Sequence, residues 1–226
     1  LIPVMINHDA FYVSHALEPV DVPAQSLVDR YLPPYAPEHF LDPDRGESWG
    51  NVVSQALYYR HRKNLGKAMD NALHVAAEAD AEWRELVGRG YGVIENYRCD
   101  GAGTVIVTMG SMCGTAREAV DQMRADGRSV GLAKVRLFRP LPVAALRALL
   151  AQADDVVVLD RNFSPGVGGV LHQELRSALY GLDPAPRVHG FLAGVGGVNV
   201  PPGKIIEFVD RSGAARIPAA ETVWAS

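Results

Sequence analysis

The second half of the chain alternates short apolar runs with segments of helical pattern. Residues 104–109 (TVIVTM) form a β-branched apolar run that stops at Gly110, which predicts a buried strand. A helix is expected next, since Thr115 and Glu118 have the spacing of a capping box, and residues 130–138 return to strand character. These elements predict a β-α-β unit with parallel strands and a right-handed crossover.

The same alternation continues on both sides of this unit. Upstream, Asp100 and Gly101 lie between residues 91–98 and the first buried strand, so we expect residues 91–98 to pair antiparallel with that strand in a hairpin, at the edge of the sheet. The segment 91–210 is therefore predicted to be an α/β domain. Its further elements are a helix from Pro142, a strand at 156–160, a helix opened by residues 166–169, a strand at 188–192 and a helix at 201–209.

The start of the chain has a different pattern. Residues 1–6 are apolar like the middle of a strand and do not begin with methionine, so we expect further sequence to precede them. Residues 18–50 are rich in proline, which forbids long helices and removes sheet donors. They nevertheless keep apolar side chains such as Tyr31 and Phe40, which favours an ordered arm that packs on another surface over a free linker.

After this arm, helix is predicted to resume by about Asn51. Residues 61–89 carry an apolar stripe at i, i+3, i+4 and i+7 spacing opposite charged residues, and Gly88 and Gly90 end the pattern. The sequence thus predicts residues 1–90 as arm and helix, followed by the α/β domain. Residues 211–226 have little pattern and are predicted to be a tail.

Composition limits the classes of function. The chain has 226 residues, 48% of them hydrophobic and 21% charged, with a formal net charge of -4, so it can bury a full core and attracts neither nucleic acid nor anionic lipid. Its apolar runs are too short to span a membrane. Two cysteines, Cys99 and Cys113, give no disulfide framework and no Cys-x-x-Cys motif. We therefore expect a reducing, cytoplasmic location, and no ligand set for an iron–sulfur cluster or other metal in this chain.

Three glycine-rich loops follow predicted strands. Free backbone amides and a helix dipole at such loops can hold an anion, and ligands of open α/β sheets collect at the carboxyl ends of strands. The glycine spacing matches neither a dinucleotide fingerprint nor a Walker loop, so purely structural tight turns are the favoured interpretation. The three loops can share a ligand crevice, but a domain interface can use these strand ends equally well. The candidate loop residues are Gly110, Ser111 and Gly114, then Gly166, Gly168 and Gly169, with residues 194–197 as a third turn.

Three arginines stand at the ends of predicted strands. Arg136, Arg139 and Arg161 can grip a carboxylate or phosphate, or they can pair with acidic residues across a domain contact. The second alternative is favoured, because no nucleophile or cofactor motif accompanies them.

Isolated reactive side chains give weaker hypotheses. Cys113 lies near a predicted helix N-terminus, which can lower a thiol pKa, but no base accompanies it. His8 and His15 flank Asp9 without a recognisable metal spacing, and His172 is expected on a helix face. No residue is assigned as catalytic, cofactor-binding or metal-ligating on these grounds.

Several motifs in matching order resemble the alpha subunit of pyruvate and related 2-oxoacid:ferredoxin oxidoreductases. The resemblance covers roughly residues 1–209. In the second half its motifs are VTMGS at 107–111, LFRPLP at 137–142, VLDR at 158–161, GVGG at 166–169, ALYG at 178–181 and AGVGG at 193–197. In the first half they are IPVM at 2–5, HALEPV at 15–20, VDRYLPPY at 28–35 and LDPD at 41–44.

The resemblance implies more than the residue patterns do. Such enzymes use thiamine diphosphate, with Mg, to decarboxylate a 2-oxoacid, pass electrons through iron–sulfur clusters to ferredoxin or flavodoxin, and transfer the acyl group to coenzyme A. By this likeness, residues 1–90 begin with the end of a pyrimidine-binding domain. Residues 91–210 correspond to a transketolase C-terminal-like domain, a three-layer α/β fold with a mixed, mostly parallel five-stranded sheet.

Two functions remain open at this stage. In the first, the chain is a structural and interface-forming part of such an oligomeric oxidoreductase, without catalytic residues, while other subunits or domains hold the cofactors. In the second, it is a free-standing α/β domain that binds a small anionic ligand at its glycine loops. A thiol enzyme that uses Cys113 is a third, weaker idea.

Overall fold

A mixed sheet forms the centre of the α/β half of the chain in this computed structural model, which describes residues 2–215 and 217–225. Within these residues the sheet has six strands, in the order β1-β3-β2-β4-β7-β8. The strands are β1 (Ile94–Tyr97), β2 (Thr104–Thr108), β3 (Val130–Val135), β4 (Asp155–Asp160), β7 (Arg187–Leu192) and β8 (Val223–Trp224). The short strands β5 (Phe163–Ser164) and β6 (Gly168–Gly169) form a separate antiparallel pair.

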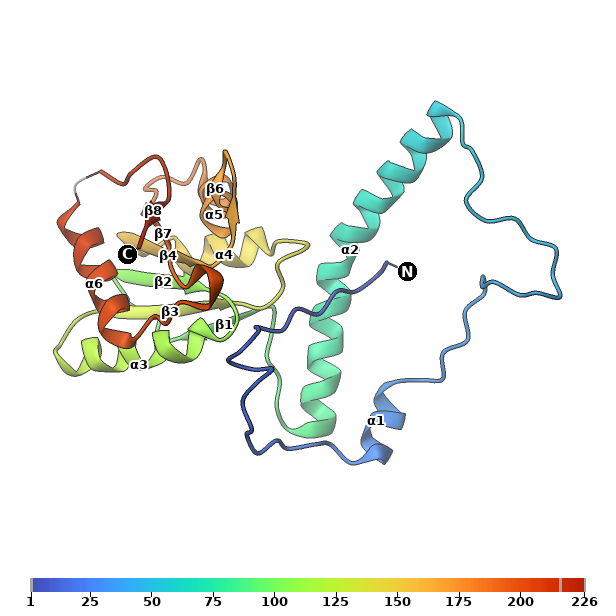
Figure 1. The fold of residues 1–226 in the computed structure, drawn as a ribbon, viewed down its shortest axis with the longest axis horizontal. Helices are drawn as coiled ribbons and strands as arrows, with labels where there is room; N and C mark the ends of the chain where they lie inside the picture. Colours follow the sequence, from blue (N-terminus) through green and yellow to red (C-terminus); the bar gives the residue numbers. More distant parts are fainter. Residues whose placement is uncertain (1, 216, 226) are drawn as a thin grey trace. The chain divides into compact units, whose positions relative to one another are not determined.

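Helices cover both faces of this sheet (Figure 1). The helices are α3 (Met112–Ala125), α4 (Val143–Leu150), α5 (Val170–Leu179) and α6 (Pro202–Ala214). On one face, α3 and α6 bury residues such as Ile106 and Phe208, and on the other α4 and α5 bury Val107 and Leu146. The three-layer α/β fold and its mostly parallel sheet are therefore confirmed, with β8 as a sixth strand beyond the five expected.

The partner of the antiparallel edge strand differs from the prediction. β1 pairs with β3, with Ile94 opposite Val135, and not with β2 in a hairpin. Both edges of β2 are taken by the parallel strands β3 and β4. After β1 the chain crosses closely over β3: a Cβ on Gly131 of β3 would lie only 2.7 Å from the carbonyl oxygen of Arg98. The Asp-Gly pair thus belongs to a connection that passes over a neighbouring strand.

Two element boundaries also differ. Helix α3 begins at Met112, after Ser111, so Thr115 lies inside the helix and the predicted capping box is wrong. Helix α6 continues to Ala214, and Thr222 and β8 pack back onto the sheet unit. The described part of residues 211–226 is therefore more structured than its weak pattern predicts.

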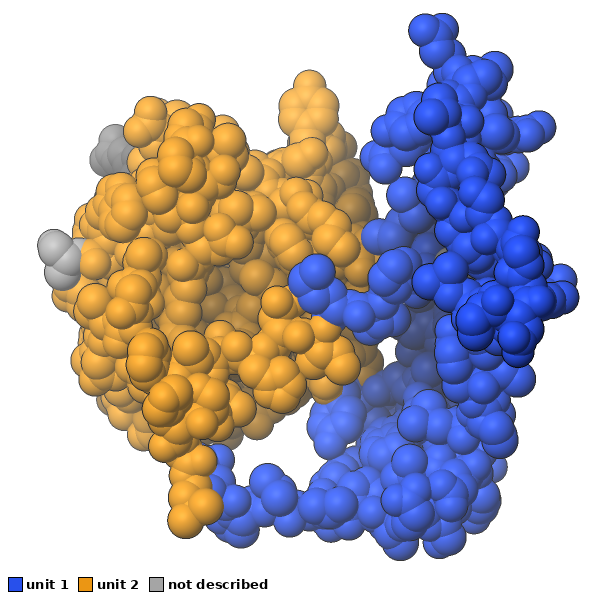
Figure 2. All heavy atoms as spheres, turned by 45° about the vertical axis from the view of Figure 1, so that its right-hand side comes forward, with its two compact units in different colours: residues 1–5, 18–91 blue, residues 6–17, 92–226 orange. Residues whose placement is uncertain are grey.

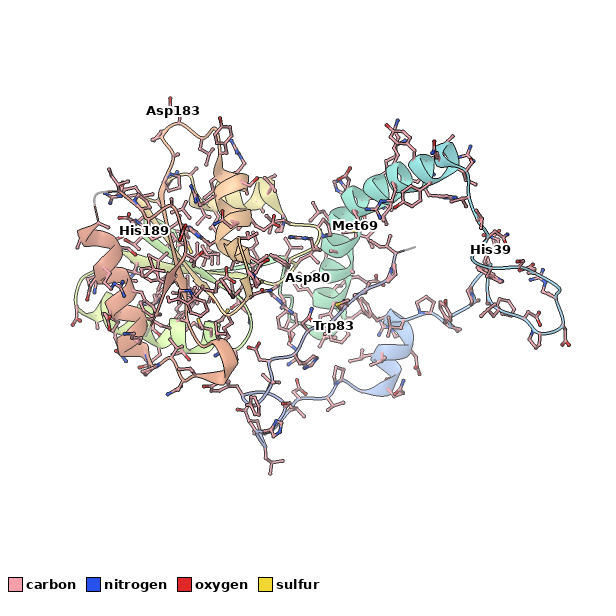
Figure 3. The ribbon with its side chains drawn as sticks, turned by 45° about the horizontal axis from the view of Figure 1, so that its top comes forward. His39, Met69, Asp80, Trp83, Asp183 and His189 are labelled. Atoms are coloured by element: carbon pink, nitrogen blue, oxygen red, sulfur yellow. The ribbon has the colours of Figure 1, made fainter. Side chains whose placement is uncertain are left out.

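The first unit consists of residues 1–5 and 18–91, and the second of residues 6–17 and 92–226 (Figure 2). In the first unit, α1 (Gln25–Tyr31) packs against α2 (Gln55–Val87) through an edge-on contact of Tyr31 with Trp83. Figure 3 labels Trp83 on α2. The predicted long helix exists and begins at Gln55, close to the start expected at about Asn51, with Ser54 as its N-cap and Gly88 in the left-handed conformation at its end. Residues 6–17 belong with the α/β unit, although the sequence grouped them with the arm.

Candidate functional site

The first glycine loop holds a carboxylate from this chain. Between β2 and α3, the Ser111 amide donates a hydrogen bond to Asp9 Oδ2. Gly110 has φ +67°, and a Cβ there would lie 2.5 Å from Asp9 Oδ2, so only glycine leaves room for the carboxylate. Arg161, which follows β4, donates to Ser111 Oγ at 3.0 Å and lies 3.5 Å from Asp9 Oδ2. Gly110, Ser111 and Arg161 therefore meet at one place, and the anion there is Asp9.

The charge of Asp9 is stabilised by this loop. Partial burial raises the pKa of its carboxyl group, but hydrogen bonds from the Ser111 side chain and amide, together with the charge of Arg161, outweigh burial and lower that pKa below its ordinary value. Asp9 is consequently ionised at neutral pH. Its negative charge also lies at the N-terminus of α3, where the helix dipole favours an anion.

Aromatic residues beside Asp9 fill the neighbouring loops. The guanidinium of Arg161 lies 5.1 Å from the ring centre of Tyr12, and the Tyr12 hydroxyl donates to Asn199 Oδ1 at 3.3 Å. Phe11 lies over the third glycine turn, since a Cβ on Gly197 would be 3.6 Å from its ring. The ends of β2, β4 and β7 are thus occupied by residues of the segment 6–17.

The second glycine loop is closed by other side chains of the same unit. The Gly169 amide donates to Thr222 Oγ1 at 2.9 Å, and the His172 amide donates to Asp160 Oδ2 at 3.0 Å. A Cβ on Gly169 would lie 3.1 Å from Asp160 Cβ, and one on Gly168 would lie 2.9 Å from Thr222 Oγ1. Gly168 and Gly169 therefore serve close packing of the loop against Asp160 and Thr222.

Burial changes the pKa values of this inner group. It raises the pKa of Asp160, against the opposing effect of backbone hydrogen bonds from His172, Asn162 and Leu171. It lowers the pKa of His172 from 6.5 to about 4, so the imidazole is neutral at physiological pH. The His172 Nδ1 atom lies 2.9 Å from Thr222 Oγ1. His172 is thus neutral and fully buried. It lies in helix α5, and a place on a helix face is what the sequence predicts for it.

The remaining candidates lie apart from the Asp9 site. Arg139 pairs with Glu174 of α5, and its guanidinium lies 4.1 Å from the Phe138 ring centre. Gly114 is exposed in the first turn of α3, where its amide donates to the Ser111 carbonyl. Gly166 is exposed in the left-handed conformation. The Arg136 amide donates to the Val93 carbonyl at 3.0 Å.

Cys113 has the opposite electrostatics from those expected of a nucleophile. It is 3% exposed in the α3 layer of the core, and burial raises its pKa to about 11. A lowered pKa at this helix N-terminus is therefore not what the structure gives, because loss of water around the thiolate outweighs the nearby charges of Lys134 and Arg161, which lower the pKa.

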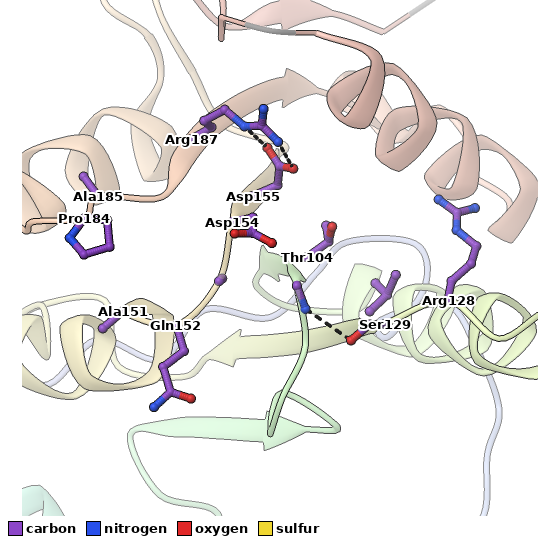
Figure 4. Close-up of a pocket in the computed structure, with 13 residues that line it drawn as sticks. Thr104, Arg128, Ser129, Ala151, Gln152, Asp154, Asp155, Pro184, Ala185 and Arg187 are labelled. Carbon is purple, nitrogen blue, oxygen red and sulfur yellow. Dashed lines mark hydrogen bonds and ion pairs between the residues drawn. The ribbon is translucent and has the colours of Figure 1, made fainter.

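An open cavity of about 710 Å³ lies where β2, β3, β4 and β7 begin, at the end of the strands opposite the glycine loops (Figure 4). Both arginines that line the cavity form ion pairs. Arg187 donates two hydrogen bonds to Asp155, of 2.8 and 2.6 Å, and Arg128 lies 2.8 Å from Asp210. His189 also contacts Asp155, at 2.9 Å. None of the residues that line this cavity was proposed as a site residue from the sequence.

Side chains able to bind a metal are dispersed. Over residues 2–215 and 217–225, no three or more His, Cys, Asp or Glu side chains gather as a metal site. In the same residues, no helix combines the length and apolar character needed to cross a bilayer.

Two protein families match the chain in succession. Residues 1–81 match the thiamine diphosphate-binding family of pyruvate flavodoxin/ferredoxin oxidoreductases, and residues 102–205 match core domain II of pyruvate:ferredoxin oxidoreductase. The chain belongs to the pyruvate:ferredoxin oxidoreductase family. The resemblance seen in the sequence motifs is thereby confirmed, and members of this family recur among the curated relatives.

These relatives are named as subunits of larger enzymes. Pyruvate synthase subunit PorA of Methanothermobacter thermautotrophicus is 39% identical over 94% of this chain and 54% of its own length. Ketoisovalerate oxidoreductase subunit VorA of Pyrococcus horikoshii is 39% identical over 87% of this chain and 50% of its own. The chain therefore spans about half the length of these relatives. A solved 2-oxoglutarate:ferredoxin oxidoreductase from Magnetococcus marinus aligns with 62% of this chain and 23% of its own, with a TM-score of 0.42 and 25% identity.

No residue of this chain is assigned to thiamine diphosphate or to its metal ion. Mg²⁺ at a diphosphate is held by one or two carboxylates together with phosphate oxygens and waters. At two of the glycine loops the nearby carboxylates, those of Asp9 and Asp160, lie against the loop glycines. No reaction step is therefore assigned to the cofactor within this chain.

Proposed function

We propose that this chain is a structural and interface-forming part of a thiamine diphosphate-dependent 2-oxoacid:ferredoxin or flavodoxin oxidoreductase, which produces acyl-CoA and CO2. The observation that carries the proposal is the succession of two matched families, residues 1–81 and then 102–205, within one chain. Asp9 and Thr222 of this chain occupy the backbone amides of two glycine loops. This supports a structural role for these loops over the binding of a small external anion.

The surface of the first unit supports an interface. Its arm and long helix expose large apolar side chains, including Tyr35 at 86%, Leu41 at 77% and Tyr59 at 70%. Helix α2 has 33 residues, none of them buried. Exposed apolar surface of this extent is typical of a segment that contacts further protein.

The partners follow from the same proposal. Other subunits or domains would supply thiamine diphosphate, Mg and the iron–sulfur clusters, and electrons would leave through ferredoxin or flavodoxin. Residues 1–90 would contribute the end of the pyrimidine-binding domain with its arm and helix, and residues 91–210 the transketolase C-terminal-like domain. An oligomer in a reducing cytoplasm is part of this proposal, which agrees with two unpaired, buried cysteines.

Reconstitution tests the proposal directly. The chain is mixed with candidate partner subunits, and CoA-dependent reduction of a low-potential dye is measured with pyruvate and other 2-oxoacids. We expect activity from the mixture and none from the chain alone. Decarboxylation of a 2-oxoacid by the isolated chain, supplied with thiamine diphosphate and Mg, would contradict the assignment of reactivity to its partners.

The alternative function predicts another result. A free-standing anion-binding domain would show no activity with any partner, while an anionic metabolite would raise the melting temperature of the chain alone by mass action. The occupation of Gly110 and Ser111 by Asp9 weighs against this alternative.

A further inference from the structure

The segment Ile6–Leu17 has an unusual place in the chain. It belongs to the α/β unit, although the residues on both sides of it, 1–5 and 18–91, belong to the other unit. All of its residues are described; residues 10–14 form a turn, and none of the segment lies in a strand or helix. Its position is therefore set by side-chain contacts, since it lacks the ladder of hydrogen bonds that fixes a strand.

We propose that Ile6–Leu17 is a strap anchored to the α/β unit by Asp9, which acts as a built-in anion at the α3 N-terminus and Arg161. The geometry at α3 supports this role. Ser111 is the N-cap residue of α3 but makes no capping hydrogen bond with its own side chain, and its hydroxyl accepts a hydrogen bond from Arg161. Asp9 supplies the negative acceptor that the helix end lacks.

The rest of the strap is shaped around this anchor. Phe11 has φ +65°, an uncommon conformation for a non-glycine residue, and its amide donates to Ser14 Oγ at 3.0 Å. The turn places Phe11 over Gly197 and Tyr12 beneath Arg161. A conformation of this kind persists where surrounding contacts hold it, which is what the contacts of Asp9 and Tyr12 do here.

Gly110 and Gly194, which follow β2 and β7, leave room for the groups that hold the strap, not for a free ligand. A Cβ on Gly110 would meet the Asp9 carboxylate, and a Cβ on Gly194 would lie 2.9 Å from Arg161 Nε. Both positions have positive φ and leave space for the groups that hold the strap. The anion-binding character of this edge is thus used internally. The proposal is independent of which reaction the assembled enzyme performs.

Hydrogen exchange on the full chain tests the strap. In Asp9→Ala we expect amide exchange across residues 6–17 and at Ser111 to be about tenfold faster than in the wild type, because one charge-assisted anchor is lost. Asp21→Ala is the matched control: Asp21 is an exposed aspartate that pairs with Arg89 in the other unit, and its loss should leave the strap unchanged. Wild-type exchange of residues 6–17 in Asp9→Ala would overturn the proposal.

Chemical rescue separates an anion anchor from mere packing. Formate added to Asp9→Ala should restore protection of residues 6–17, whereas formamide, of similar size but neutral, should not. Equal rescue by both compounds, or by neither, contradicts an anchor that works by charge. If Asp9→Ala does not fold, Asp9→Asn is measured in its place, and strap protection equal to the wild type in that variant would also overturn the proposal.

Discussion

Substitution of Gly110 by alanine probes the contact between the first glycine loop and the strap. Two effects should add in this variant. Gly110 has φ +67°, which an alanine adopts at a cost of about 1–2 kcal/mol. The new Cβ would also lie 2.5 Å from Asp9 Oδ2, so the carboxylate must move away from Ser111.

Gly101 provides a matched control for the backbone effect. It has the same φ of +67°, and nothing lies within 4 Å of a Cβ placed there. Gly101→Ala should therefore cost only the backbone term of about 1–2 kcal/mol. Gly110→Ala should cost more, about 3–4 kcal/mol in total, because it also disturbs hydrogen bonds to an ionised group, which are worth about 1.5–3 kcal/mol.

Urea unfolding of both variants measures the difference. The free energy of unfolding of Gly110→Ala should be lower than that of Gly101→Ala by about 1.5–3 kcal/mol. In an Asp9→Ala background, Gly110→Ala should cost only the backbone effect, since the carboxylate that it would displace is already absent. Equal losses in the two single variants would refute the argument that Asp9 needs a glycine beneath it.

Two further predictions follow from the buried titratable groups. Burial raises the pKa values of the Cys99 and Cys113 thiols to about 11, so both should resist iodoacetamide at neutral pH in the native chain and react once urea unfolds it. Labelling of native Cys113, followed by mass spectrometry, would contradict its burial. The pKa of His172 is about 4 in the folded chain and 6.5 ordinarily, so between these pH values the unfolded chain binds more protons than the folded chain. The stability that the neutral imidazole contributes is therefore complete above pH 6.5 and is lost as the pH falls toward 4. Through this residue, the free energy of unfolding should drop by about 2 kcal/mol from pH 7.5 to pH 5, and in His172→Gln it should drop less. An equal drop in both proteins would contradict the lowered pKa of His172.

The repeating elements of the α/β unit are predictable because their signals are local. The run at 104–109 is β-branched and apolar, and it becomes β2 almost residue for residue. The partner of β1 could not be predicted from local sequence, since it depends on the chain passing over Gly131. No feature of residues 91–104 indicates that crossing. The start of α3 was missed for a related reason: its cap is completed by Asp9, which is 102 positions away from Ser111.

The candidate site shows the same division. Gly110, Ser111 and Arg161 were predicted as a possible anion site from their places at strand ends, and the structure brings them together. Asp9 and Thr222, which fill the loops, were not predicted to lie there, because each sits in a segment with little periodicity. The available signal was a single aspartate beside two aromatic residues, which is too short to distinguish a contact from an exposed turn.

The contact of Thr222 has a practical consequence for where the α/β unit is cut in the laboratory. The family match ends at residue 205, but the hydroxyl that accepts from the Gly169 amide and lies beside His172 comes seventeen positions later in the sequence. An expression boundary drawn at the end of the match, or just after α6, would leave a buried amide without its acceptor. A shortened version intended to fold by itself should therefore run past Trp224.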